Sequence, residues 1–245
     1  MASFVLRRSF RLIPRHRAFS TPSNLAVWRK AEAVCFDVDS TVIGEEGIDV
    51  LAAHCGQGEA VSAWTSKAMN GGVKFEDALA ARLAIIKPSK AAINACLGAH
   101  PPTQHLTPGV ATLIMALQRR NVDVYLVSGG FRLMIAPVAA HLGIPASNIF
   151  ANTILFHDDG SYKGFDATEL TSRDGGKPRV IELLKKERGY KTVVMVGDGA
   201  TDMQAKPPAD LFIGFGGVVA RDVVEKHADW FVRDFNDLIE GLARP

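Results

Sequence analysis

Residues 33–41 read AVCFDVDST, so a short apolar run with few polar side chains ends in two aspartates separated by one residue. We expect a strand over Ala33–Val38, because an almost continuous apolar run is typical of a strand covered on both faces. Asp37 and Asp39 come at, or just after, the carboxyl end of this strand, which is the edge where open α/β sheets bind ligands. This stretch therefore predicts both the class of fold and the position of a site.

The same pattern recurs along the chain, where short apolar runs alternate with amphipathic helical stretches. Such alternation is the signature of a parallel sheet with crossover helices. Further strands are expected over Val122–Val127, Thr192–Val196, Leu211–Phe215 and Trp230–Val232. Helices are expected around residues 110–117, where apolar residues recur at helical spacing, and over residues 179–188 and 221–228. We predict an α/β fold with a doubly wound, Rossmann-like parallel sheet. Pro137 is expected to kink the helix that follows Gly130 or to delay its start.

Two segments depart from this alternation. Residues 47–105 hold no convincing strand, and inserted between the first two strands they would form a small helical cap. The helices expected in this segment are Ile48–Cys55, Ala60–Met69, Phe75–Ile86 and Lys90–Ala99. In the second segment, residues 154–165, the pair Asp159-Gly160 between two apolar-bearing runs predicts a β-hairpin. The expected organisation is a leader over residues 1–24, a core over residues 25–46 and 106–245, and a cap over residues 47–105.

The amino-terminal residues differ in charge from the rest of the chain. Residues 1–20 contain five arginines and no acidic residue, in a pattern that fits an organelle transit peptide for a plastid or mitochondrion. The alternatives are a disordered basic arm that touches membranes or nucleic acid, and a cytoplasmic protein. Without these five charges the formal net charge of +2 becomes −3, so a nucleic-acid partner is not expected. No apolar run reaches the roughly 18–20 residues that cross a bilayer, and three scattered cysteines indicate reduced, packed thiols.

Four motifs carry the chemistry, each at an expected strand end or near the start of a helix. They are Asp37-Val38-Asp39-Ser40-Thr41, Ser128-Gly129-Gly130, Lys177, and Gly197-Asp198-Gly199-Ala200-Thr201-Asp202. An aspartate carboxylate can accept a phosphoryl group and form an acyl phosphate that water later opens. Four carboxylates that converge near a phosphate require a cation, and an all-oxygen set of donors suits Mg²⁺.

The remaining groups would bind the phosphate itself. Lys177 would offset negative charge, while Ser128 offers a hydroxyl and the two following glycines offer backbone N–H donors. Each motif alone has an ordinary explanation, such as a strand-to-helix turn with a capping aspartate for residues 197–202. Their joint occurrence in this order indicates phosphoryl-transfer chemistry.

Together the four motifs resemble those of the haloacid dehalogenase-type phosphohydrolases. Longer stretches, residues 37–49, 127–132, 196–203 and 212–217, are similar to the phosphoserine phosphatases within that superfamily. The resemblance covers the chain from about residue 31 to the carboxyl terminus. It implies Mg²⁺-dependent hydrolysis of O-phospho-L-serine to L-serine and phosphate through an aspartyl-phosphate, as the last step of L-serine biosynthesis.

The resemblance also implies a role for each matching residue. Asp37 would be the nucleophile, and Asp39 would protonate the departing serine oxygen and then activate the hydrolytic water. Mg²⁺ would be held by Asp37, the backbone carbonyl of Asp39 and Asp198, with Asp202 supporting them. The substrate-binding residues of the core would be Ser128, Gly129, Gly130, Lys177 and Thr201.

Substrate choice is expected to come from the cap. By resemblance, Glu46 would take the ammonium of phosphoserine, and Arg82 would clamp its carboxylate through two parallel hydrogen bonds. Met69 and Phe75 would close over the substrate and exclude water. The alternatives are a helix cap for Glu46, a solvated helix face for Arg82, and core positions for Met69 and Phe75.

Two other functions are compatible with these motifs. The first is a phosphatase for another small amine or amino-acid phosphate, such as phosphoethanolamine or phosphohomoserine. The second is a non-catalytic regulatory protein on the same scaffold, although unused carboxylates clustered together would only repel one another. In either enzymatic case the partner is a small molecule. The oligomeric state is left open, a homodimer included.

Overall fold

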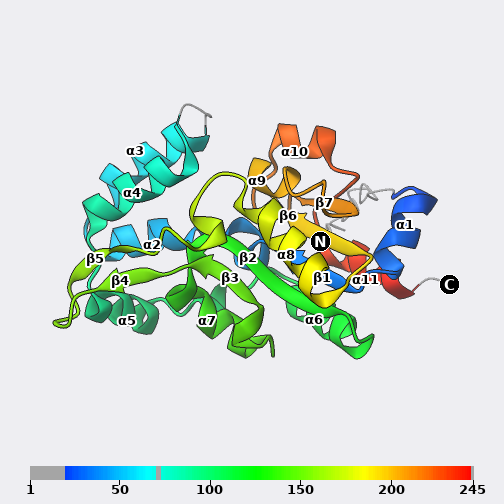
Figure 1. Ribbon diagram of the computed structural model, residues 1–245, viewed down its shortest axis with the longest axis horizontal. Helices are drawn as coiled ribbons and strands as arrows, with labels where there is room; N and C mark the ends of the chain where they lie inside the picture. The colour runs from blue at the N-terminus through cyan, green and yellow to red at the C-terminus, as the bar shows by residue number, and fades with distance from the viewer. Residues whose placement is uncertain (1–19, 70–72, 244–245) are drawn as a thin grey trace, which may run out of the picture.

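A single parallel sheet organises the core of the protein. The computed structural model describes residues 20–69 and 73–243, apart from the side chains of residues 65–69. Within these residues a six-stranded sheet has the order β3-β2-β1-β6-β7-β8, with every neighbouring pair parallel (Figure 1). The strands are β1 Ala33–Phe36, β2 Asp123–Phe131, β3 Ile149–Asn152, β6 Val193–Gly197, β7 Leu211–Phe215 and β8 Trp230–Val232. The predicted doubly wound α/β fold is confirmed.

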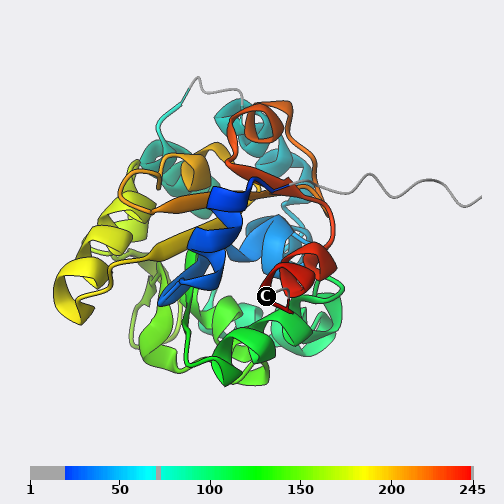
Figure 2. The same ribbon diagram turned by 90° about the vertical axis from the view of Figure 1, so that its right-hand side faces the viewer.

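Helices cover both faces of the sheet, and each face has its own apolar core (Figure 2). One face is packed by α1 Pro22–Arg29, α6 Val110–Arg119, α7 Arg132–His141 and α11 Phe235–Ala243. The other is packed by α8 Gly176–Arg188, α9 Ala200–Met203 and α10 Asp222–His227. All four residues of β1 are fully buried, which explains its unbroken apolar sequence.

Several boundaries differ from the sequence-based prediction. The strand β2 extends to Phe131, so Ser128-Gly129-Gly130 lies within its irregular end and not after it. The strand β3 was not expected, because its four residues carry no alternating pattern of their own. The helix α7 begins at Arg132 and contains Pro137, so the proline does not delay its start. Residues 1–19 of the expected leader lie outside the described residues, and Pro22 begins α1.

A second unit is inserted between β1 and β2. Its helices are α2 Gly47–His54, α3 Gly58–Met69, α4 Phe75–Ile86 and α5 Lys90–Ala99, each beginning within two residues of its expected start. The expected hairpin is also present, as β4 Ile154–Phe156 and β5 Tyr162–Phe165. The apolar residues of the hairpin pack into the same core as these helices, and the two lie together at one end of the molecule (Figure 1).

Among the residues that the structure describes, no helix combines the length and the apolar character that crossing a bilayer requires.

Candidate active site

The first two aspartates are placed by the turn that follows β1. The backbone turns over residues 38–42, where Ser40 adopts a left-handed conformation with φ of 54°. The carboxylate of Asp37 accepts a hydrogen bond from the N–H of Val38 at 2.7 Å. The carboxylate of Asp39 accepts one from the N–H of Gly47 at 2.9 Å, which ties the turn to the start of α2. Both aspartates line the same cavity, so the turn directs both carboxylates toward one site.

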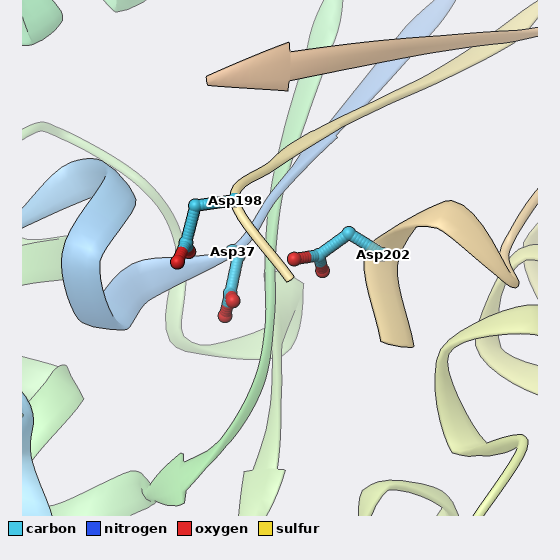
Figure 3. A group of neighbouring side chains, drawn as sticks. All are labelled: Asp37, Asp198 and Asp202. Carbon is cyan, nitrogen blue, oxygen red and sulfur yellow. The ribbon is translucent and has the colours of Figure 1, made fainter. Parts of the chain in front are cut away.

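Three carboxylates from different elements meet at this edge of the sheet. Oxygens of Asp37, Asp198 and Asp202 all lie within 4.8 Å of one another, and Figure 3 shows them pointing toward a common space. Asp198 follows β6, the neighbour of β1, and it accepts a hydrogen bond from the hydroxyl of Thr41 at 3.0 Å. Asp202 is fully buried in α9 and accepts one from the N–H of Gly199 at 2.9 Å.

Lys177 supplies positive charge inside this cluster. It lies in the first turn of α8, and its ammonium nitrogen is 3.0 Å from Asp37 Oδ2 and 2.5 Å from Asp202 Oδ1. Burial disfavours the charged form, but the carboxylates of Asp202 and Asp37 outweigh it and raise the pKa of Lys177. The lysine therefore remains protonated between two carboxylates.

The crowded carboxylates repel one another. Burial, together with the charge of Asp37, raises the pKa of Asp198 and raises the pKa of Asp202 to about 8. Burial also raises the pKa of Asp39, with further contributions from the charges of Glu46 and Asp37. A divalent cation among these oxygens would remove the repulsion, and oxygen-only donor sets are those that hard cations prefer. The residues therefore fit a metal ion.

The Ser128-Gly129-Gly130 turn forms another wall of the site. Ser128 is buried, and its hydroxyl oxygen accepts a hydrogen bond from the N–H of Gly130 at 2.9 Å. A side chain at Gly130 would place its Cβ 2.9 Å from a carboxylate oxygen of Asp39, and one at Gly129 would lie 2.8 Å from the ring of Phe75. Only glycine permits this close approach of the backbone to both neighbours.

A cavity of about 370 Å³ lies between the sheet edge and the inserted helices. Most of the residues singled out in the sequence line it. They are Asp37, Asp39, Glu46, Phe75, Arg82, Gly129, Gly130, Lys177, Asp198 and Thr201. Ser128 and Asp202 lie beside it through their contacts with Gly130 and Lys177. The side chain of Met69 lies outside the described residues.

The two charged residues expected to recognise substrate are both directed into the cavity. Glu46 precedes α2 but makes no capping hydrogen bond, and instead accepts one from the hydroxyl of Ser40 at 2.7 Å. Arg82 is 9% exposed and its Nε donates to the carbonyl of Ala78 at 3.1 Å, so it does not occupy a solvated helix face. Burial lowers the pKa of Arg82, yet a guanidinium keeps its charge in proteins.

The sequence left two roles open for Phe75, a cover over the substrate and a position in the apolar core, and the structure is compatible with both. Phe75 lines the cavity, and it also packs against the apolar core of the inserted helices.

Three charged residues that line the cavity are not predicted as site residues from the sequence: Arg173, Asp174 and Arg221. Arg221 lines the cavity, and its Nε and Nη2 lie 3.0 Å and 2.9 Å from Asp198 Oδ2. From the sequence, Arg221 is expected only as the first residue of a helix over residues 221–228. Its signal was weak, because it comes several residues after β7 and belongs to no recognisable motif. The available clue was its position in a loop that leaves the same edge of the sheet.

Known proteins with similar sequences point to the same family. The family model described as haloacid dehalogenase-like hydrolase matches residues 31–209. The chloroplastic phosphoserine phosphatase of Arabidopsis thaliana is 52% identical over 231 residues, which cover 93% of this chain and 78% of that protein. The phosphoserine phosphatase of Bos taurus is 55% identical over 212 residues, 86% of this chain and 93% of that protein. The chain belongs to the phosphoserine phosphatase family of haloacid dehalogenase-like hydrolases.

A solved structure of the phosphoserine phosphatase family shares the fold. It is described as the phospho-aspartyl intermediate analogue of phosphoserine phosphatase and is 27% identical to this chain. The match has a TM-score of 0.73 and covers 86% of this chain and 98% of that one. The sheet, the inserted helices and the cavity described above are therefore those of a phosphoserine phosphatase family member.

Proposed function

We propose that this chain is a Mg²⁺-dependent phosphatase that hydrolyses O-phospho-L-serine to L-serine and phosphate through an aspartyl-phosphate on Asp37. This activity would complete the synthesis of L-serine. One observation carries the proposal. A single cavity is lined by a pair of aspartates for phosphoryl chemistry, Asp37 and Asp39, and also by the buried Arg82 and by Glu46. The far end of phosphoserine carries the matching carboxylate and ammonium.

The two steps use Asp37 and Asp39. In the first, a carboxylate oxygen of Asp37 attacks phosphorus, the bond from phosphorus to the serine oxygen breaks, and Asp39 gives that oxygen its proton. In the second, Asp39 takes a proton from water, whose oxygen attacks phosphorus and releases Asp37. The raised pKa of Asp39 favours the protonated acid that the first step needs. The intermediate analogue of the related phosphatase supports an aspartyl-phosphate.

The phosphoryl group and the metal ion would share the acidic end of the cavity. Asp37, the backbone carbonyl of Asp39 and Asp198 would hold Mg²⁺, with the carboxylate of Asp202 supporting them. Bound there, the ion would supply positive charge to the phosphoryl oxygens. Further donors to these oxygens would be Ser128, Gly129, Gly130, Lys177 and Thr201.

The inserted helices would select the substrate. Glu46 would bind the ammonium and Arg82 the carboxylate, while Met69 and Phe75 would cover the bound molecule. We propose residues 47–105 as a cap on a core formed by residues 25–46 and 106–245. We also propose an organelle-targeting leader, because residues 1–20 are rich in arginine and free of acidic residues. Predicted over residues 1–24, it would end before Thr21, which caps α1 in the folded core.

A screen of small phosphomonoesters tests this function. Phosphoserine, phosphoethanolamine, phosphohomoserine and p-nitrophenyl phosphate would be supplied with Mg²⁺ or with EDTA, and phosphate release measured. We expect phosphoserine to be preferred and EDTA to abolish turnover. The variant Asp37→Asn should keep its fold and lose activity by about a thousandfold or more, because an amide is not a phosphoryl acceptor.

Other outcomes of the screen would favour a different function. Preference for phosphoethanolamine would show that Arg82 selects no carboxylate. A lack of phosphate release from all four compounds would favour a regulatory protein. Turnover by Asp37→Asn close to that of the wild type would exclude Asp37 as the nucleophile.

A further inference from the structure

Asn152 is a fully buried polar residue that the proposed mechanism does not use. It is the last residue of β3, and its side chain has 0% exposure. The amide nitrogen donates a hydrogen bond to the carbonyl oxygen of Gly129 at 2.8 Å. The amide oxygen accepts one from the hydroxyl of Thr171, itself buried, at 3.0 Å. Both polar groups of the side chain are therefore engaged.

The contact with Gly129 occurs where the pairing of two strands is interrupted. Val127 pairs with Phe150 and Phe131 pairs with Asn152, so β2 advances by four residues while β3 advances by two. The two extra residues of β2 lie within the Ser128-Gly129-Gly130 turn, which faces only Ala151 of β3 and bulges out of the ladder. Such bulges leave backbone groups without a ladder partner and redirect neighbouring side chains. The amide of Asn152 supplies the partner that the carbonyl of Gly129 lacks in the ladder.

This hydrogen bond orients the rest of the turn. The carbonyl of Gly129 and the N–H of Gly130 belong to one planar peptide, so holding the carbonyl also fixes the N–H. That N–H donates to the hydroxyl oxygen of Ser128 at 2.9 Å. Because the oxygen of Ser128 already accepts a hydrogen bond, its own O–H is left to donate elsewhere. The chain of contacts thus runs from Thr171 through Asn152 to the hydroxyl of Ser128.

We propose that Asn152, supported by Thr171, is the positioning residue that aims the Ser128 hydroxyl and the Gly129–Gly130 peptide at the phosphoryl group. The inference rests on the proposed function only in taking this turn as the phosphoryl-binding element. Asn152 acts through the turn and does not touch the substrate. An asparagine suits the position because one side chain must donate to Gly129 and accept from Thr171 in a buried space.

The test compares Asn152→Ala with a matched variant, Asn148→Ala. The side-chain amide of Asn148 donates to the carbonyl of Val124 at 3.0 Å, so it makes the same kind of bond between the same regions of the chain, but at the other end of β2. We expect Asn152→Ala to lower kcat/KM about tenfold to hundredfold, the size of loss that follows from a small misplacement of reacting groups. Asn148→Ala should remain within about twofold of the wild type.

Two readouts separate positioning from a general loss of structure. The loss in Asn152→Ala should be equal for phosphoserine and for p-nitrophenyl phosphate, because the turn contacts the phosphoryl group that both share. The inhibition constant of inorganic phosphate should rise by a similar factor. This second measurement depends only on phosphate binding, so it decides the inference even if the preferred substrate is not phosphoserine.

Thr171 provides an independent variant if Asn152→Ala does not fold. Thr171→Val removes the hydroxyl but keeps the shape, and we expect a smaller loss of the same kind, while Thr171→Ser should restore activity. Combined with Asn152→Ala, Thr171→Val should add almost nothing, because both act through one chain of contacts. Wild-type phosphate inhibition in Thr171→Val, or in a folded Asn152→Ala, would overturn the proposal. Fully additive losses in the double variant would also overturn it.

Discussion

At the scale of single residues, acidic side chains outnumber basic ones around the site. The carboxylates of Asp37, Asp198 and Asp202 are matched by the ammonium of Lys177 and the guanidinium of Arg221. Asp39 and Glu46 add further acidic groups to the same cavity. An excess of buried carboxylates attracts cations, and it would repel a phosphate dianion in the absence of a metal ion. The same residues therefore explain why the site suits both a divalent ion and the ammonium of an amino acid.

A variant of Arg82 tests whether this residue selects substrates that carry a carboxylate. Arg82→Ala should lower kcat/KM for phosphoserine by about a hundredfold or more, since the buried carboxylate of the substrate would lose its charged partner. The loss for p-nitrophenyl phosphate should be several times smaller, because that molecule carries no carboxylate. Steady-state kinetics with both substrates measure the difference. The exposed Arg179 of α8 provides the control variant Arg179→Ala. Equal losses on both substrates would show that Arg82 is not a specificity clamp.

At the scale of elements, α1 closes one layer of the core. Thr21 caps this helix by accepting a hydrogen bond from the N–H of Asn24 at 3.2 Å. Trp28 is 1% exposed, and its indole nitrogen donates to the carbonyl of Leu238 in α11 at 3.0 Å. The two helices lie beside each other although more than two hundred residues separate their contacting groups (Figure 2). A short helix is stable here because it packs on a distant one.

Trp28 therefore tests how much α1 stabilises the fold. Trp28→Ala should lower the free energy of unfolding by about 3–5 kcal/mol, since it empties a large buried volume. Trp28→Phe should lose less, because it retains most of the packing and gives up the hydrogen bond to Leu238. Urea denaturation measures both, with the exposed Lys30→Ala as the control. A loss in Trp28→Ala no larger than that of Lys30→Ala would contradict the packing role of α1.

At the scale of the whole molecule, the sheet, with an apolar core on each face, and the inserted helices, with a core of their own, meet at one cavity. The sheet order places β1 between β2 and β6, so their carboxyl ends deliver the Asp37, Ser128 and Asp198 segments to the same edge. The inserted helices share a core with the hairpin, and the helix residues Ile48, Phe75, Leu79 and Arg82 line the cavity at that edge. With the roles proposed above, Asp37 and Asp39 come from the sheet edge, whereas Arg82 and Phe75 come from the inserted helices.

Binding of Mg²⁺ should raise the free energy of unfolding of the whole protein. Mg²⁺ at about a hundred times its dissociation constant should raise the stability by about 2.7 kcal/mol, because it binds the folded chain only. A thermal-shift titration would show this as a rising melting temperature. In Asp198→Asn the rise should be lost or need far more Mg²⁺, whereas the exposed Asp158→Asn should behave like the wild type. The same rise in Asp198→Asn as in the wild type would exclude Asp198 as a ligand.

Five of the six strands of the sheet, and its reactive edge, could be predicted from the amino-acid sequence. The apolar run before Asp37 predicts a buried strand, and the motifs around Ser128, Lys177 and Asp198 follow from local patterns of the same kind. In a parallel sheet all strands end at one edge, so the motifs had to converge once the strands were recognised. For these residues, the local sequence pattern is enough to predict where they lie in the fold.

The groups that support this edge could not be predicted from the sequence. Arg221 belongs to no motif, β3 is too short to show a period, and the hairpin of β4 and β5 proved to share a core with the inserted helices. The role of Asn152 depends on an interruption in the pairing of β2 with β3, which no local pattern encodes. The physical reason is that these features arise from contacts between segments far apart in the chain, and such contacts exist only after the chain has folded.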